Sequence, residues 1–181
     1  LGVSGVVRDA RGAYVPVTGE GGHRTLSPSN EREWQVMRVL QSRYGHASAE
    51  RALSGPGLVN LLSAVCQLDA VRIPEVVDPA EVSAMAFEQK DPHAHEAVRL
   101  FTGWLGATAG DLALTLGATG GVFVAGGIVP RWGEHLDASL FRQRFEDKGR
   151  SRSWLERIPT WVIAEPQPGL TGLRQLALAP P

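Results

Sequence analysis

The residues best suited to chemistry lie in a glycine-rich segment near the start of the chain, residues 19–23 (GEGGH). Its three glycines flank a carboxylate, Glu20, and an imidazole, His23. One interpretation is a tight turn that carries two surface side chains. The other is a binding loop, because glycine lets the backbone approach a ligand closely. A carboxylate accepts hydroxyl hydrogen bonds and an imidazole donates or accepts one, so the pair suits a polyol such as a sugar.

A second carboxylate, Glu50, stands beside Arg51 in residues 45–51 (GHASAER). Taken alone, the two are either an exposed pair of helix charges or a further ligand contact. Residues 54–57 (SGPG) come next, and they are interpreted first as a helix breaker and second as a ligand loop. Pro56 suits the first turn of the helix that follows.

A third segment, residues 120–130 (GGVFVAGGIVP), predicts a short apolar strand that ends at Gly126 and Gly127 before a helix begins. Ligands of open α/β sheets bind beyond the carboxyl ends of strands, and a helix start offers free N–H groups. The segment has neither the GxxxxGK(S/T) pattern of a P-loop nor the GxGxxG pattern of a Rossmann fold. Spacing alone is therefore a weak indication of nucleotide binding.

Few residues remain for metal or redox chemistry. His93 and His95 are two apart and do not share a helix face, so both are expected at the surface, and His135 has no partner at ligand spacing. The single cysteine, Cys66, lies in an apolar run and is expected in the core. The sequence predicts no metal site and no disulfide.

The elements that must position these residues begin with a β-hairpin over residues 1–7 and 13–17. The order of elements then predicts an α/β fold, or a mixed α/β fold with an antiparallel hairpin at its edge. The wholly apolar strand 121–125 predicts a sheet covered on both faces, and the small residues of the 91–116 helix indicate close packing against another backbone. Helices are predicted from Ser29 or Asn30 to Gly45 and over residues 47–53, 56–68 and 91–116. Further helices are predicted to begin after Asp78, Pro130 and Pro168, and a second buried strand is predicted at 160–164.

Composition indicates an ordinary globular chain, with 181 residues, 43% hydrophobic and 20% charged. This length is enough for one sizeable core, so residues 1–181 are expected to form a single domain. The net charge of −1 favours neither a nucleic acid nor an anionic membrane as partner. No apolar stretch reaches the roughly 20 residues of a membrane span, and no secretory leader is recognisable. A cytoplasmic location is the expectation.

Four motifs follow one another along the chain: residues 20–23 (EGGH), 46–58 (HASAERALSGPGL), 120–131 (GGVFVAGGIVPR) and 145–150 (FEDKGR). In this order and spacing they resemble the bacterial glucokinase family of the hexokinase and actin-like ATPase superfamily. The similarity covers residues 1 to about 173 and implies a two-lobed fold with ribonuclease-H-like halves. This chain would be its C-terminal, larger-domain portion, helix-rich with a mixed sheet. Members of the family transfer a phosphoryl group from ATP to glucose in glycolysis. By analogy with the family, a homodimer is also expected.

The resemblance also implies residue roles. Glu20, His23 and Glu50 would bind sugar hydroxyls, while Gly126 and Gly127 would belong to the adenosine-binding motif. Mg²⁺ would arrive with the nucleotide. For His46 and for residues 54–57 we expect structural roles.

The chain departs from the family pattern in what it lacks. An N-terminal phosphate-binding motif and the Asn-Asp pair that supplies the catalytic base are both missing, and only Leu1 and Gly2 remain of a second phosphate motif. We therefore assign no catalytic residue and expect the chain alone to be inactive. The alternative is a stand-alone, non-catalytic module for sugar binding or protein interaction.

Overall fold

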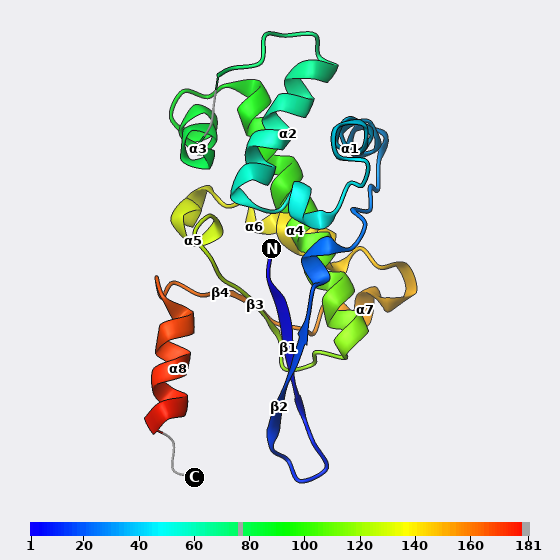
Figure 1. Ribbon diagram of the computed structural model, residues 1–181. Helices are drawn as coiled ribbons and strands as arrows, with labels where there is room; N and C mark the ends of the chain where they lie inside the picture. The colour runs from blue at the N-terminus through cyan, green and yellow to red at the C-terminus, as the bar shows by residue number, and fades with distance from the viewer. Residues whose placement is uncertain (76–77, 179–181) are drawn as a thin grey trace.

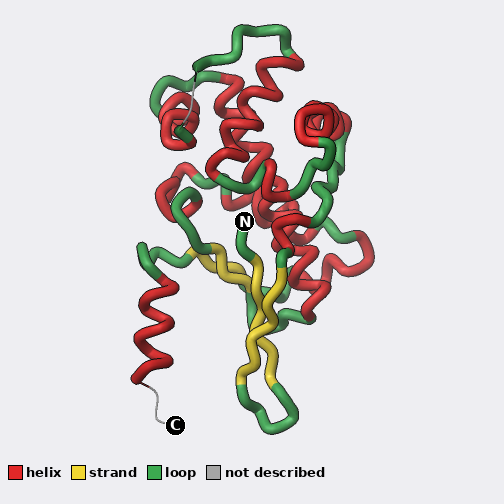
Figure 2. Tube along the Cα trace, in the orientation of Figure 1, coloured by secondary structure: helices red, strands yellow, loops and turns green. Residues whose placement is uncertain are grey.

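A computed structural model describes residues 1–75 and 78–178. The last three positions of the expected 1–181 domain lie outside the described residues. The fold is α/β and helix-rich, with two small sheets (Figures 1 and 2). A mixed sheet was expected, and this expectation is wrong for the described residues, where the strands form two separate two-stranded sheets.

The predicted hairpin is confirmed as the antiparallel pair β1 (Val3–Arg8) and β2 (Tyr14–Gly19), in the register Val3 with Gly19 and Arg8 with Tyr14. Its turn forms because Asp9 Oδ1 accepts hydrogen bonds from the backbone N–H groups of residues 11 and 13, at 2.8 and 2.9 Å. The turn end of the hairpin extends beyond the helices (Figure 2). All of β2 is exposed.

Side-chain caps explain where the main helices begin. Asn30 caps α1 (Glu31–Tyr44), Ser54 caps α2 (Gly55–Leu68), Asp78 caps α3 (Pro79–Phe87) and Asp91 caps α4 (Pro92–Leu116). Each cap oxygen accepts a backbone N–H of the first turn, which satisfies a donor that the helix itself leaves unpaired. Gly45 ends α1 with a positive φ of 74°, as predicted.

The helix expected over residues 47–53 is reduced to one 3₁₀ turn, η2 (Ala49–Arg51). The reason is a competing pairing. Leu26 N donates to Ala47 O and Ala49 N donates to Arg24 O, both at 2.9 Å, around an antiparallel bridge between residues 25 and 48. Backbone groups that pair across this bridge are not free to form helix hydrogen bonds.

The core surrounds α4, which lies against α2, α3 and α6 (Ala138–Glu146). Cys66 is buried there, as predicted, and burial raises the pKa of its thiol. The expected close backbone packing of α4 is also confirmed. A Cβ on Gly106 would lie 2.2 Å from Phe141 O, and one on Gly110 would lie 2.3 Å from Phe145 O, both on α6.

The predicted strands after α4 are confirmed as the parallel pair β3 (Val122–Val124) and β4 (Thr160–Val162). The expected burial on both faces is wrong, because Phe123 is 61% exposed and Trp161 is 44% exposed. These two rings stack on one face of the pair, with centroids 4.7 Å apart. Val122 and Val124 pack against the core from the other face.

The remaining elements are short or peripheral. The final helix, α8 (Pro168–Leu178), was predicted, and it has no buried residue. Among the described residues, no helix combines the length and the apolar character that crossing a membrane requires. The remaining turns and helices are η1 (Gly21–His23), α5 (Val129–Trp132), η3 (Gly133–His135), η4 (Gly149–Ser151) and α7 (Arg152–Leu155).

Candidate functional site

The structure brings Glu20 and His23 together on the 3₁₀ turn η1, which directly follows the hairpin. His23 Nε2 lies 3.9 Å from Glu20 Oε2, and both side chains are largely exposed. The glycines between them are needed for packing, because a Cβ on Gly22 would lie 2.2 Å from Leu1 O and one on Gly21 would touch the Val3 side chain at 3.0 Å. The turn can therefore sit directly on the first residues of the chain.

The bridge between residues 25 and 48 places η2, with Glu50, beside η1. Glu20, His23 and Glu50, here called the Glu–His cluster, thus come from two turns that the backbone holds together.

Residues 54–57 have the structural role expected of them. Ser54 Oγ accepts from Gly57 N at 3.0 Å and donates to Glu50 O at 2.8 Å, so one hydroxyl both caps α2 and fixes the backbone of Glu50. A Cβ on Gly57 would lie 2.6 Å from the Ala52 backbone, so only glycine fits this approach without displacement. His46 is exposed, and no ligand role for it follows.

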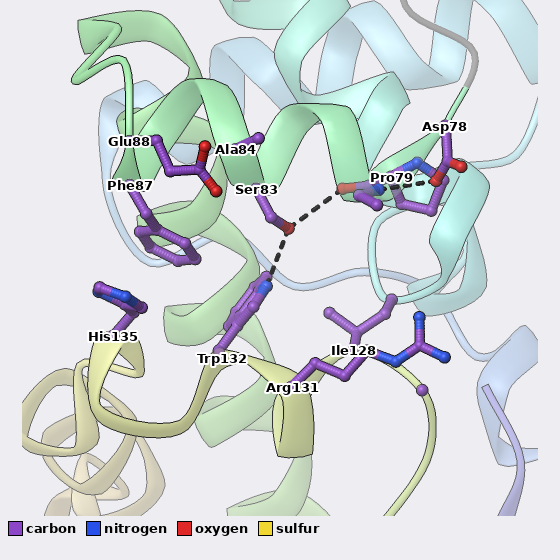
Figure 3. Close-up of a pocket in the computed structure, with 12 residues that line it drawn as sticks. Asp78, Pro79, Ser83, Ala84, Phe87, Glu88, Ile128, Arg131, Trp132 and His135 are labelled. Carbon is purple, nitrogen blue, oxygen red and sulfur yellow. Dashed lines mark hydrogen bonds between the residues drawn. The ribbon is translucent and has the colours of Figure 1, made fainter.

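Gly126 and Gly127 lie elsewhere, in the loop between β3 and α5. Gly126 has φ +121°, a conformation that favours glycine, and no atom lies within 4 Å of a Cβ built on either residue. Gly127 lines a cavity of about 340 Å³ between α3 and α5, here called the α3–α5 pocket (Figure 3). The loop is therefore open toward a concave surface.

Aromatic rings form one part of the wall of the α3–α5 pocket, and the carboxylates of Asp78 and Glu88 line another. Phe87 stacks on His135, with centroids 4.6 Å apart and planes 13° apart. Trp132 meets Phe87 edge-on and donates a hydrogen bond from Nε1 to Ser83 Oγ at 2.9 Å (Figure 3). Arg131 also lines the pocket. Such a cavity can hold a flat heterocycle against its aromatic side, with Arg131 available to an anionic tail.

Sequence reasoning missed this pocket and left His135 without a role. Its walls come from α3, α5 and η3, and no spacing in the sequence connects Phe87 with His135. The expectation for His95 is confirmed, because it is exposed. His93 is half-buried, with Nε2 3.6 Å from Asp69 Oδ2 and Nδ1 4.0 Å from Asp91 Oδ1.

The start of α2 lies between the two sites. Ser54 holds Glu50, and the next residue, Gly55, approaches Pro79 of the pocket wall, whose Cγ would be 3.3 Å from a Cβ at position 55. A polar cluster suited to hydroxyls and an aromatic pocket suited to a heterocycle therefore adjoin the same helix end. The arrangement could hold two different small molecules side by side.

Comparison with known proteins identifies the family of the chain. The family model described as Glucokinase matches residues 1–179. The glucokinase of Nitrobacter hamburgensis is 49% identical over 180 residues, which are 99% of this chain and 56% of that protein. The glucokinase of Aromatoleum aromaticum is 52% identical over 172 residues, which are 95% of this chain and 51% of that protein. The chain thus spans about half the length of these curated relatives.

Solved structures show the same relationship. A crystal structure of glucokinase from an Antarctic psychrotroph matches with a TM-score of 0.88 and 30% identity, covering 97% of this chain and 54% of that one. A glucokinase from Balamuthia mandrillaris, solved in complex with glucose, has the same fold, with a TM-score of 0.78 and 21% identity over 91% of this chain and 47% of that one. The resemblance carried by the four motifs is confirmed, and the chain belongs to the glucokinase family.

Proposed function

We propose that the intact protein transfers the γ-phosphoryl group of ATP to the 6-hydroxyl of glucose, giving glucose 6-phosphate. The observation that carries the proposal is the pair of adjoining sites at the start of α2, the Glu–His cluster for the sugar and the α3–α5 pocket for the nucleotide. The four motifs of the family contribute to both sites or to the helices beside them.

In this proposal Glu20 and Glu50 accept hydrogen bonds from sugar hydroxyls, and His23 donates or accepts one. Gly126 and Gly127 leave the approach to the α3–α5 pocket open, the aromatic side of the pocket holds the adenine, and Arg131 lies near the phosphates. Phosphoryl transfer depends mainly on positioning and electrostatic stabilisation, with a base that acts on the nucleophile. None of the described residues is assigned as that base, so this chain alone is proposed to bind without turnover.

Among the described residues, no group of three or more His, Cys, Asp or Glu side chains could hold a metal ion. Mg²⁺ is proposed, from the family resemblance, to arrive with the nucleotide, and no step is assigned to it. A single domain of ribonuclease-H-like architecture and a role in cytoplasmic glycolysis belong to the same proposal. The homodimer and the placement of the chain within the full-length enzyme stay predictions.

Glu20→Gln in the full-length enzyme is expected to raise the KM for glucose about 10- to 100-fold, because hydrogen bonds to a charged group contribute about 1.5–3 kcal/mol. The KM for ATP should stay unchanged. A coupled assay of ADP release measures both constants. Glu31→Gln is the matched control, since Glu31 is an exposed carboxylate of α1 outside both sites. Unaltered glucose KM and kcat in Glu20→Gln would contradict the sugar assignment.

Gly127→Leu is expected to raise the KM for ATP about tenfold or more and to leave the KM for glucose unchanged, because the new side chain would grow into the mouth of the α3–α5 pocket. Gly120→Leu is the control. It makes the same change at the other end of β3, where no atom lies within 4 Å of an added Cβ. Equal KM values for ATP in the two variants would mean that the nucleotide does not bind in the α3–α5 pocket.

Assays of the full-length protein distinguish the proposal from the alternative, a non-catalytic sugar-binding module. Glucose-dependent ADP release supports the kinase. Glucose binding by calorimetry, with no ADP release at saturating ATP, would favour the module.

A further inference from the structure

Arg24 directly follows His23 and is held from three sides. Its Nη2 donates to Thr108 Oγ1 at 2.5 Å, and its Nη1 lies 3.3 Å from Asp111 Oδ2, both on α4. Its carbonyl oxygen accepts the hydrogen bond from Ala49 N at 2.9 Å. One residue therefore ties the turn that carries Glu20 and His23 to the turn that carries Glu50, and both to the central helix.

The attachment continues along one face of α4. Trp104, Thr108 and Asp111 are spaced by four and three residues, so they lie on the same side of the helix. Trp104 Nε1 donates to Ser27 O at 3.1 Å. Residues 24–27 are thus fastened along about two turns of α4, with Arg24 at the end nearest the Glu–His cluster.

Asp111 is itself held by a second cation. Lys148 Nζ lies 2.7 Å from Asp111 Oδ1, and its side chain is only 16% exposed. Gly110 makes room for it, because a Cβ there would lie 3.0 Å from Lys148 Cε. Lys148 belongs to the FEDKGR motif of residues 145–150, which neither the Glu–His cluster nor the α3–α5 pocket has used.

The orientation of the Arg24 guanidinium depends on these few contacts. Its Nε is buried and has no hydrogen-bond partner among the described residues. Thr108 and Asp111 therefore supply the side-chain contacts that fix the group. If the Asp111 carboxylate is lost, Lys148 and Arg24 repel each other and only one hydroxyl holds the guanidinium.

We propose that Asp111 is a positioning residue for the sugar: with Lys148 it orients Arg24, and Arg24 sets η1 against η2 so that Glu20, His23 and Glu50 meet the same ligand. The inference rests on the proposed glucose site, and no contact between Asp111 and the sugar is implied.

The test is steady-state kinetics of the full-length enzyme bearing Asp111→Asn. We expect the KM for glucose to rise about 5- to 30-fold, while kcat and the KM for ATP change less than twofold. Asp69→Asn is the matched control, because Asp69 is 34% exposed against 37% for Asp111 and also faces two basic groups, Arg32 at 2.8 Å and His93 at 3.6 Å. It should leave the KM for glucose unchanged, although both variants lose a comparable ion-pair network.

Lys148→Met should raise the KM for glucose in the same direction, and the double variant Asp111→Asn, Lys148→Met should not exceed Asp111→Asn, because the two residues act through one contact. Thr108→Val, which removes only the hydroxyl, serves as the test if Asp111→Asn does not fold.

The positioning role is overturned if Asp111→Asn, or Thr108→Val in its place, shifts the KM for glucose no more than Asp69→Asn while Glu20→Gln does shift it. If Glu20→Gln has no effect either, the glucose site itself is wrong, and the inference fails with it.

Discussion

Replacing Arg144 by methionine is expected to lower the free energy of unfolding by about 3 kcal/mol, because the change leaves a buried carboxylate without its cation. Arg144 Nη2 lies 3.0 Å from Glu33 Oε2, and the two side chains are 12% and 7% exposed. Glu33 keeps its bonds from Ser29 N at 2.8 Å and Asn30 Nδ2 at 3.0 Å, which holds the loss at the lower end of the range for buried pairs. Urea denaturation followed by circular dichroism measures the change.

Two further variants make that result specific. Arg152→Met removes an arginine from an exposed pair with Glu156, whose side chains are 59% and 50% exposed. Its second contact, with Glu146 at 3.8 Å, is long, and Glu146 keeps its pair with Arg142, so stability should change by about 0.5 kcal/mol or less. The double variant Glu33→Gln, Arg144→Met removes both charges and should recover much of the loss. Equal losses in Arg144→Met and Arg152→Met would show that the Glu33 contact contributes nothing beyond a surface pair.

Alanine at both Gly106 and Gly110 should destabilise the protein by about 2–5 kcal/mol, although alanine favours a helix interior over glycine by about 1 kcal/mol. The added Cβ atoms would meet the carbonyl oxygens of Phe141 and Phe145 at 2.2 and 2.3 Å. These are backbone atoms of α6, which cannot move aside as the end of a long side chain can. The two helices would have to separate, and the core between them would lose contacts.

Gly103→Ala is the control on the same helix. Its Cβ would lie 3.8 Å from Arg144 Cγ, which is an ordinary contact, so the helix preference for alanine should raise stability by up to about 1 kcal/mol. Thermal and urea denaturation should thus give opposite signs for Gly103→Ala and for the double variant. A stabilised double variant would mean that α4 and α6 are farther apart than the structure has them.

Local chemistry made much of this fold predictable. Asn30, Asp78 and Asp91 mark helix starts because their side chains satisfy backbone donors within three residues, which is visible in the sequence alone. The hairpin was predictable for the same reason, since Asp9 and Gly12 form its turn from neighbouring residues. The small residues of α4 predicted a close helix neighbour, although not that α6 would be that neighbour.

What the sequence could not supply depends on residues far apart in the chain. The helix predicted over 47–53 is replaced by a bridge to residues 24–26, which propensity cannot anticipate. Arg24 meets Thr108 across 84 positions. The α3–α5 pocket joins Phe87 to His135 in the same way, so its walls show no spacing pattern. Glu20, His23 and Glu50 could be proposed from the sequence because the motifs that contain them are local, and their role as a sugar site stays a prediction.

The single face of α4 that holds Trp104, Thr108 and Asp111 has a consequence for how this sequence can diverge. One residue inserted between Trp104 and Thr108 would turn the rest of the helix by about 100°. Gly110 would then no longer face α6, and Asp111 would lose its contacts with Arg24 and Lys148, although none of these residues is replaced. We therefore expect α4 to accept exchanges at its exposed positions far more readily than insertions or deletions, and variation in length to be confined to the loops that flank it.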